Sequence, residues 1–177
     1  MSEMGDMKFT TAGNMVDRPV FTMLVGVPGS GKSTWLSNNN YHDLPNVMIL
    51  STDAYIETVA TDEGKTYSEV FRDVIKQAEM HLYHCLDVAI KHKMDIIWDQ
   101  TNLTRKTRMN KLRHIPWDYY RIALVFPTPE PKTHTAWLNS DARAGKTIPD
   151  PIMHSMIENF EHPTMGEGFN AIRTVDR

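Results

Sequence analysis

The sequence predicts an α/β fold, a three-layer sandwich in which a mostly parallel sheet of five strands lies between helices. Two observations predict it. Short apolar segments alternate along the chain with longer segments that repeat apolar residues at helical spacing. The first apolar segment also runs directly into a glycine-rich octet and then into a stretch that can form a helix. Such alternation is typical of parallel sheets that helices cover on both faces.

Each expected element is a segment of one type bounded by turn-forming or polar residues. The expected strands span 20–26, 46–50, 95–98, 120–126 and 171–175. The expected helices lie near 32–38, 67–91, 105–114, 132–142 and 151–160. Because parallel strands end at the same edge of a sheet, the functional site is expected beyond their carboxyl ends.

Two of the expected helices carry start signals. Thr66 and Glu69 have the spacing of a capping box at the start of the longest helix. Asp150 is the expected N-cap of the last helix, with Pro151 at its first position. The predicted apolar face of the longest helix comprises Val70, Phe71, Val74, Ile75, Ala78, Leu82, Leu86 and Ala89.

Length and composition predict one domain over residues 19–177, preceded by a flexible polar tail over 1–18. The net charge of −3 excludes a global basic field for nucleic acid but leaves a local patch open. Cys85 is the only cysteine, so no internal disulfide can form, and a cytoplasmic location is expected (the host cytoplasm if the protein is phage-encoded). The apolar runs are too short for a membrane span, so no membrane partner is expected. The sequence does not indicate an oligomeric state.

Residues 26–33 read GVPGSGKS and fit G-x-x-x-x-G-K-[S/T], the loop that wraps nucleotide phosphates. Gly29 and Gly31 permit the backbone conformations that point successive N–H groups into one concavity. The helix that follows adds the partial positive charge of its N-terminus. Lys32 can reach the β- and γ-phosphates, and the Ser33 hydroxyl can ligate Mg²⁺. The predicted ATP-binding residues are Gly26, Pro28, Gly29, Ser30, Gly31, Lys32, Ser33 and Thr34, together with Arg143 from further along the chain.

Asp53 follows the second expected strand, in the segment Ser51-Thr-Asp53. A carboxylate near the phosphates can accept the proton of an attacking hydroxyl and orient it in line with the γ-phosphate. We therefore predict that Asp53 is the general base. The alternative is that Asp53 only caps a helical turn over residues 54–57.

Polar residues also follow the third expected strand. Asp99 can hold a water molecule bound to Mg²⁺, as a Walker B acid does. Thr101 and Asn102 are short hydrogen-bonding residues suited to an acceptor or to the loop itself. The alternative for this segment is turn chemistry, which favours the same residue types.

A basic, glycine-containing segment before the last helix reads NSDARAGKTIP over residues 139–149 and has the character of a helical lid. Arg143 can close on the transferring phosphate and neutralise its developing charge, and Lys146 is a second candidate. Alternatively, these cations complement the dipole at a solvated helix C-terminus.

Basic residues crowd the helix near 105–114, where they could contact nucleic acid, although such a run is more often a solvated face. They are Arg105, Lys106, Arg108, Lys111 and Arg113. His81, His84 and Cys85 share one helix, but no second ligand cluster supports a metal there.

Taken together, the segments GVPGSGKSTW, STDAY, DQTNLT and the R-x-G-K-x-I-P lid followed by PDPIMHSM resemble the kinase module of phage polynucleotide 5′-kinases, over most of residues 20–160. The resemblance implies a P-loop kinase fold and transfer of the ATP γ-phosphate to the 5′-hydroxyl of DNA or RNA, with Mg²⁺. It implies nucleotide and Mg²⁺ contacts for Lys32 and Ser33, the base role for Asp53 and the lid role for Arg143. It also implies that Thr101 and Ile148 lie near the acceptor.

The sequence departs from that family at two places on the acceptor side. The family has an arginine three residues after the base aspartate, which grips the acceptor's 3′-phosphate, and Ile56 stands there in this chain. The family's Asp-Thr-Asn is Gln100-Thr101-Asn102 here, with the acid displaced to Asp99. Acceptor binding must therefore use other basic groups or a different acceptor.

Three functions fit these residues. The first is an ATP-dependent kinase of a nucleic-acid 5′-hydroxyl. The second is a kinase of another hydroxyl, in a hydroxymethylated DNA base, a nucleotide or a small metabolite. The third is a nucleotide-binding regulatory module without transfer activity, against which the joint presence of Lys32, Ser33, Asp53 and Arg143 argues.

Overall fold

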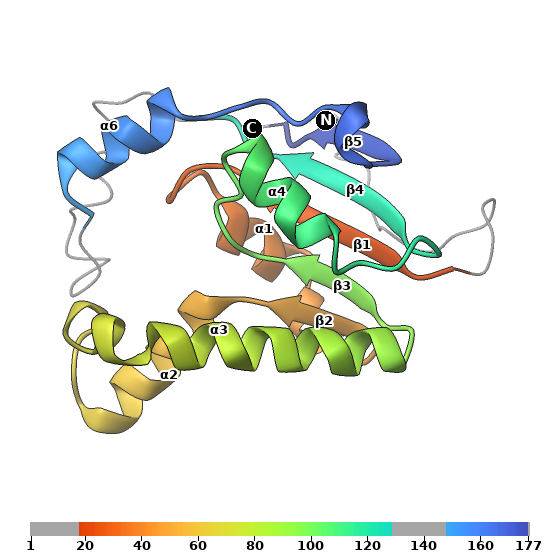
Figure 1. The fold of residues 1–177 in the computed structure, drawn as a ribbon. Coiled ribbons are helices and arrows are strands. Elements are labelled where there is room, and N and C mark those ends of the chain that lie inside the picture. The colour runs from red at the N-terminus through yellow and green to blue at the C-terminus, as the bar shows by residue number, and fades with distance from the viewer. Residues whose placement is uncertain (1–17, 129–147, 177) are drawn as a thin grey trace, which may run out of the picture.

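The computed structural model describes residues 18–128 and 148–176, which form a five-stranded sheet with helices on both faces (Figure 1). The strand order is β2-β3-β1-β4-β5, and every neighbouring pair is parallel. The strands are β1 (Val20–Val25), β2 (Val47–Leu50), β3 (Asp95–Trp98), β4 (Tyr120–Val125) and β5 (Ala171–Thr174). The predicted fold class is confirmed, and each strand begins and ends within one residue of its predicted bounds.

The helices are α1 (Lys32–Asn38), α2 (Thr52–Glu63), α3 (Tyr67–Lys91), α4 (Arg105–Leu112) and α6 (Asp150–Glu158), with 3-10 turns at Tyr41–Asp43 and Met165–Glu167. Alternate residues of β1 show how these helices form two outer layers. Phe21 and Met23 pack in a core cluster with side chains of α3 and α4, whereas Leu24 packs on the opposite face with Leu36 of α1. The three predicted layers are therefore present.

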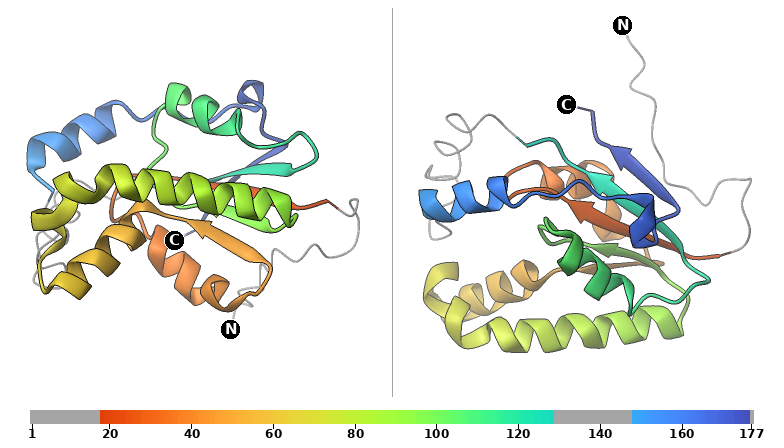
Figure 2. Two further views of the ribbon diagram at one scale, coloured as in Figure 1. Left: turned by 60° about the horizontal axis from the view of Figure 1, so that its bottom comes forward. Right: turned by 45° about the horizontal axis from the view of Figure 1, so that its top comes forward.

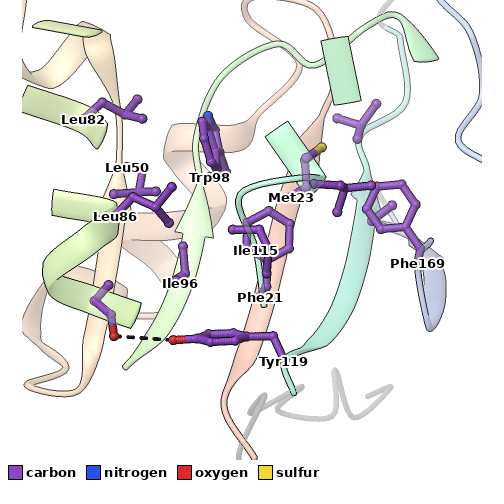
Figure 3. Close-up of a cluster of buried hydrophobic side chains, with 14 of the residues drawn as sticks. Phe21, Met23, Leu50, Leu82, Leu86, Ile96, Trp98, Ile115, Tyr119 and Phe169 are labelled. Atoms are coloured by element: carbon purple, nitrogen blue, oxygen red, sulfur yellow. Dashed lines mark hydrogen bonds between the residues drawn. The ribbon is translucent and has the colours of Figure 1, made fainter. Parts of the chain in front are cut away.

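The larger core cluster joins α3 to the sheet and is closed at one end by a tyrosine (Figure 3). Leu82 and Leu86 of α3 project toward Ile96 and Trp98 of β3. The phenol of Tyr119 donates hydrogen bonds to the carbonyls of Ala89, at 3.4 Å, and Met94, at 3.1 Å. This packing fixes the long helix along the sheet, with its N-terminal end at the edge where the strands end (Figure 2).

Helix α2 is a full helix of 12 residues where the sequence indicated only a turn over 54–57. Ser51 caps its start by accepting a hydrogen bond from the Ala54 N–H at 3.3 Å, and Gly64 ends it with φ 63°. Its threonines and β-branched residues have low helix propensity, which hides it from a reading of the sequence. Packing of Ile56 and Ala60 against α3 supplies the stability that propensity does not.

One of the two predicted helix starts is confirmed. The capping box is present, since Glu69 accepts from the Thr66 N–H at 2.7 Å. Helix α6 begins at Asp150 rather than at Pro151, so Pro149 and not Asp150 occupies the N-cap position.

The expected helix near 132–142 and almost all of the expected tail lie outside the described residues. Over the residues that are described, no helix has the length and apolar character needed to cross a membrane.

Candidate active site

The glycine-rich octet forms a loop between β1 and α1, and its backbone has the predicted conformation. Gly29 and Gly31 have φ of 78° and 102°, in the region where residues with a Cβ are strained. Gly26 is required for a different reason, because a Cβ there would lie 2.6 Å from Ser30 Oγ and 2.9 Å from Phe126 Cβ. Helix α1 starts directly behind the loop, so its first N–H groups face the same concavity.

Lys32 is nearly buried and holds the loop together in this structure. Its ammonium donates hydrogen bonds of 2.9 Å to the carbonyls of Gly26 and Val27. These are carbonyls of the loop itself, so the ammonium lies beside the backbone that is predicted to wrap the phosphates. Lys32 therefore lies against the loop in which it is predicted to act.

A cavity of about 770 Å³ lies beside this loop, a volume in the range of small-molecule sites. It brings together residues from the ends of three strands and from α2, α3 and α6. The predicted site residues that line it are Pro28, Gly29, Lys32, Ser33, Asp53, Asp99, Thr101 and Ile148. The predicted residues Gly26, Ser30, Gly31, Thr34 and Asn102 do not line it.

Asp53 lies in the first turn of α2 and faces this cavity. The alternative role as a helix cap is excluded, because Ser51 caps the helix. The positive end of the helix dipole favours a negative charge at Asp53. The phenol of Tyr67, in the first turn of α3, donates a hydrogen bond of 2.8 Å to Asp53 Oδ1. The two helices thereby hold the carboxylate from two directions.

Tyr67 was not singled out from the sequence, although it lines the cavity and contacts the predicted base. Burial raises its pKa above the usual value near 10, and the negative charges of Asp53 and Glu57 raise it further. The phenol therefore stays protonated near neutral pH and remains a donor to Asp53. An aromatic residue at the start of a helix gave no signal in the sequence that distinguished it from a core residue.

The segment after β3 is tied to the glycine-rich loop. The N–H of Gly26 donates to the carbonyl of Thr101 at 3.0 Å, and the N–H of Asp99 donates to the carbonyl of Leu50 at 2.9 Å. Asp99 and Thr101 therefore lie between the ends of β1 and β2 and line the cavity. Ile148 reaches it from the other side, ahead of α6, and packs near Val27.

Asn102 was predicted to contact an acceptor, but it does not line the cavity. Its side chain is 1% exposed, its φ is 50°, and its amide donates to the carbonyl of Leu24 at 2.7 Å and to that of Gln100 at 3.0 Å. Its side-chain oxygen accepts a hydrogen bond from Lys111. Asn102 therefore stabilises the loop and is not placed to contact an acceptor, which is the second of the two roles that the sequence left open.

The residues present fit a magnesium ion that is held mainly by its substrate. Ser33 and Asp99 line the same cavity, and the described residues contain no group of three or more acidic, histidine or cysteine side chains that could hold an ion alone. Mg²⁺ commonly takes only one or two protein ligands together with phosphates and water. Arg143, predicted to close on the phosphates, lies outside the described residues.

A family model described as an AAA domain matches residues 21–163, from β1 to beyond α6. The chain belongs to the AAA_33 family of AAA domains. Heterogeneous nuclear ribonucleoprotein U-like protein 2 of Mus musculus and that of Homo sapiens are each 26% identical to it over 145 residues. The match covers 80% of this chain and spans 19% of the length of those relatives.

Solved structures share the fold of this AAA_33 domain. A candidate kinase of Chloroflexus aurantiacus has a TM-score of 0.64 at 21% identity, covering 89% of this chain and 88% of that one. A chain of the Pnkp1/Rnl/Hen1 RNA repair complex has a TM-score of 0.61 at 19% identity, covering 83% of this chain and 45% of that one. The AAA_33 domain therefore has a P-loop kinase-like α/β fold.

Lys111 of the AAA_33 domain lies behind the cavity. Its ammonium donates to the side-chain oxygens of Gln100 and Asn102 and lies 5.2 Å from the ring centre of Trp98. Gln100 in turn donates to Thr52 Oγ1 at 3.0 Å, next to Asp53. Burial lowers the pKa of Lys111 to about 7, which the negative charge of Glu79 partly opposes.

Arg108 is buried, whereas the run of basic residues suggested a solvated face. Its guanidinium is fully buried and pairs with Glu167, with Nε to Oε2 at 2.7 Å and Nη2 to Oε1 at 2.9 Å. It also donates to the carbonyls of Leu103 and Glu161, at 2.9 and 2.8 Å. Two of the five basic residues of this segment, Arg108 and Lys111, therefore organise the interior of the AAA_33 domain behind its loop.

Proposed function

We propose that this AAA_33 domain is an ATP-dependent kinase that transfers the γ-phosphate to a hydroxyl of nucleic acid, most simply the 5′-hydroxyl of a polynucleotide. The observation that carries the proposal is that Asp53, held by Tyr67, shares one cavity with Lys32 and Ser33 of the phosphate-binding loop. A loop that only binds a nucleotide needs no carboxylate positioned across the same cavity. In a phosphate-transferring site, such a carboxylate can act as the general base for the attacking hydroxyl.

On the donor side, the loop receives the phosphates of ATP. The left-handed backbone at Gly29 and Gly31 and the start of α1 turn N–H donors toward them. Lys32, which lies against the loop, donates to a phosphate oxygen and neutralises charge on the transferring group. Ser33 and Asp99 would hold Mg²⁺, which when bound would supply further neutralisation of the phosphate charge.

On the acceptor side, Asp53 accepts the proton of the attacking hydroxyl. A bond forms between the hydroxyl oxygen and the γ-phosphorus, and the bond from that phosphorus to the β,γ-bridging oxygen breaks. The electron pair of the broken bond stays on ADP, and the proton stays on the Asp53 carboxylate until solvent removes it. The hydrogen bond from Tyr67 keeps the carboxylate in one orientation, and the phenol retains its proton throughout.

The names of one structural neighbour and of the curated relatives support a nucleic acid as the acceptor. One structure with the same fold belongs to an RNA repair complex, and the curated relatives are by name ribonucleoproteins. The predicted acceptor residues Thr101 and Ile148 line the cavity together with Asp53. The domain boundaries 19–177, the lid role of Arg143 and the cytoplasmic location stay part of the proposal.

A second candidate is a kinase of another hydroxyl, in a hydroxymethylated DNA base, a nucleotide or a small metabolite. It is favoured by Ile56, which is fully buried against α3 where the resemblance would put a phosphate-binding arginine. The acidic side chains of Glu57 and Asp99 in the cavity also make it less basic than a nucleic-acid site commonly is.

The two candidates differ in where label from ATP arrives. We would incubate the protein with γ-labelled ATP and Mg²⁺ and supply 5′-hydroxyl DNA and RNA oligonucleotides, hydroxymethylated duplex DNA, nucleosides and small alcohols. Label on the 5′ end of an oligonucleotide supports the first candidate, and label on a base, nucleoside or alcohol supports the second. If ATP binds but no acceptor is labelled, the domain is a nucleotide-binding module and the proposal is wrong.

A further inference from the structure

Among the described residues, the arginine that lines the cavity comes from an unexpected element. Arg72 lies in the second turn of α3 and lines the cavity. Among the lining residues that the structure describes, the lysine and arginine side chains are Lys32 and Arg72. Lys32 belongs to the phosphate-binding loop, so Arg72 is the one further arginine or lysine among the described lining residues that can bind a second phosphate.

No described residue engages the guanidinium of Arg72. The side chain is exposed, and within residues 18–128 and 148–176 no ion pair or hydrogen bond engages it. Three carboxylates line the same cavity, those of Asp53, Glu57 and Asp99. A phosphodiester that approaches Asp53 passes these carboxylates, so a cation on that side of the cavity favours its binding.

An apolar wall adjoins Arg72. Phe71 is 38% exposed and lines the cavity, although the helical spacing had assigned it to the buried face of α3. Its ring centroid lies 5.6 Å from that of Tyr67. Ile152 and Met156 of α6 line the same cavity, and α6 lies at the same end of the sheet as the start of α3 (Figures 1 and 2). Aromatic and aliphatic surfaces of this kind suit the face of a nucleobase.

We propose that Arg72 binds the first phosphate on the 3′ side of the acceptor's 5′-terminal nucleotide and that Phe71 packs against the base of that nucleotide. This inference rests on the proposed kinase function and names the residues that give its acceptor site a preference for nucleic acid. A guanidinium is suited to the task because its planar fork donates two hydrogen bonds to one phosphate. Arg72 supplies from α3 a contact that the buried Ile56 of α2 cannot make.

The test compares two acceptors that differ only by the phosphate and its 3′ nucleoside. Thymidine has the 5′-hydroxyl and the base, and the dinucleotide TpT adds the phosphodiester. For Arg72→Ala we expect a rise in KM for TpT of about 10- to 100-fold, the effect of losing a charged hydrogen bond. The KM values for thymidine and for ATP should stay within about two-fold of the wild-type values. The kcat with saturating TpT should also stay within about two-fold, because loss of a ground-state contact raises KM and leaves kcat unchanged.

Lys76→Ala is the matched control, since Lys76 is exposed on the same helix one turn further on and does not line the cavity. It should leave every constant unchanged. Phe71→Ala should weaken binding of thymidine and TpT by similar factors, because both carry the base. Equal KM values for TpT in Arg72→Ala and Lys76→Ala would overturn the inference.

A binding measurement separates this inference from the kinase proposal. Titration calorimetry of TpT into the wild-type protein and the two variants needs no phosphate transfer. Weaker binding in Arg72→Ala alone supports the inference even where no acceptor is phosphorylated, in which case only the kinase proposal fails. Equal binding in all three proteins overturns the inference, whether or not the protein is a kinase.

Discussion

The phenol of Tyr67 at the start of α3 donates a hydrogen bond of 2.8 Å to Oδ1 of Asp53 at the start of α2. The contact joins residues 14 positions apart, and both side chains line the cavity beside the glycine-rich loop. It explains how a carboxylate on the exposed first turn of a helix can keep one orientation. The same bond gives the base a partner that keeps its own proton, because the pKa of Tyr67 is raised.

Removal of the phenol tests the positioning of the base. We expect Tyr67→Phe to lower kcat about ten-fold, as loss of a hydrogen bond to a charged group commonly does. The KM for ATP should not change, since the aromatic ring and its contact with Phe71 remain. Tyr83→Phe, on the same helix but outside the cavity, is the control and should keep the wild-type rate. A Tyr67→Phe enzyme with unchanged kcat would show that the bond does not orient Asp53.

Lys32 should matter for both binding and turnover. We expect Lys32→Ala to weaken ATP binding and to lower the transfer rate at least about 100-fold, because the group contacts the phosphates before and during transfer. ATP titrations and initial rates measure the two effects separately. Lys65→Ala removes an exposed cation paired with Glu63 and should change neither. Wild-type ATP affinity in Lys32→Ala would argue against the loop as the donor site.

Lys111 should make stability depend on pH above neutrality. Burial lowers its pKa from 10.5 to about 7 in the folded state, so between these pH values the unfolded chain binds the extra proton. The free energy of unfolding therefore gains up to about 1.4 kcal/mol per pH unit from this group as pH rises from 7 toward 10.

Lys111→Met should remove that gain. Denaturation curves at several pH values would then show a smaller increase in stability for the variant than for the wild-type protein. Lys106→Met, at an exposed position of the same helix, should keep the wild-type slope. Parallel pH profiles for the wild-type protein and Lys111→Met would show that the lysine keeps an ordinary pKa.

Mutation of Arg108 should destabilise the fold more than mutation of an exposed basic residue of α4. Arg108 forms a buried ion pair with Glu167, in the turn at Met165–Glu167. Arg108→Met leaves the carboxylate of Glu167 buried without its partner, which commonly costs about 3–5 kcal/mol of folding free energy. Arg105→Met, at an exposed site, should stay within about 0.5 kcal/mol. Thermal or urea unfolding measures both. Similar stabilities for the two variants would contradict the structural role of the pair.

The basic segment illustrates what sequence patterns can and cannot predict here. The strands and the loop were predictable because apolar periodicity and required glycines are local signals. Arg108 and Lys111 have the same local signal as Arg105 and Lys106, and only tertiary packing places the first two inside. A list of charges along a short helix therefore could not separate a solvated face from an internal network.

The candidate site shows the same division. Asp53 and Asp99 were predictable because they follow strands of a parallel sheet, whose ends meet at one edge. Tyr67 and Arg72 approach that edge from the start of α3, and the turn of chain that brings them there follows α2, a helix that propensity did not reveal. The acceptor side is thus the part that depends most on long-range packing.

The most direct test of the account is a single-turnover measurement with Asp53→Asn. Wild-type and variant protein would each be mixed with γ-labelled ATP and a 5′-hydroxyl oligonucleotide, and ATP affinity would be measured in parallel. We predict that the wild-type protein labels the 5′ end, and that the variant transfers phosphate at least about 100-fold more slowly, because a positioned base contributes about 10²–10⁴ in rate. ATP affinity should stay within about two-fold. Equal transfer rates in the two proteins, or no transfer by the wild-type protein, would contradict the account.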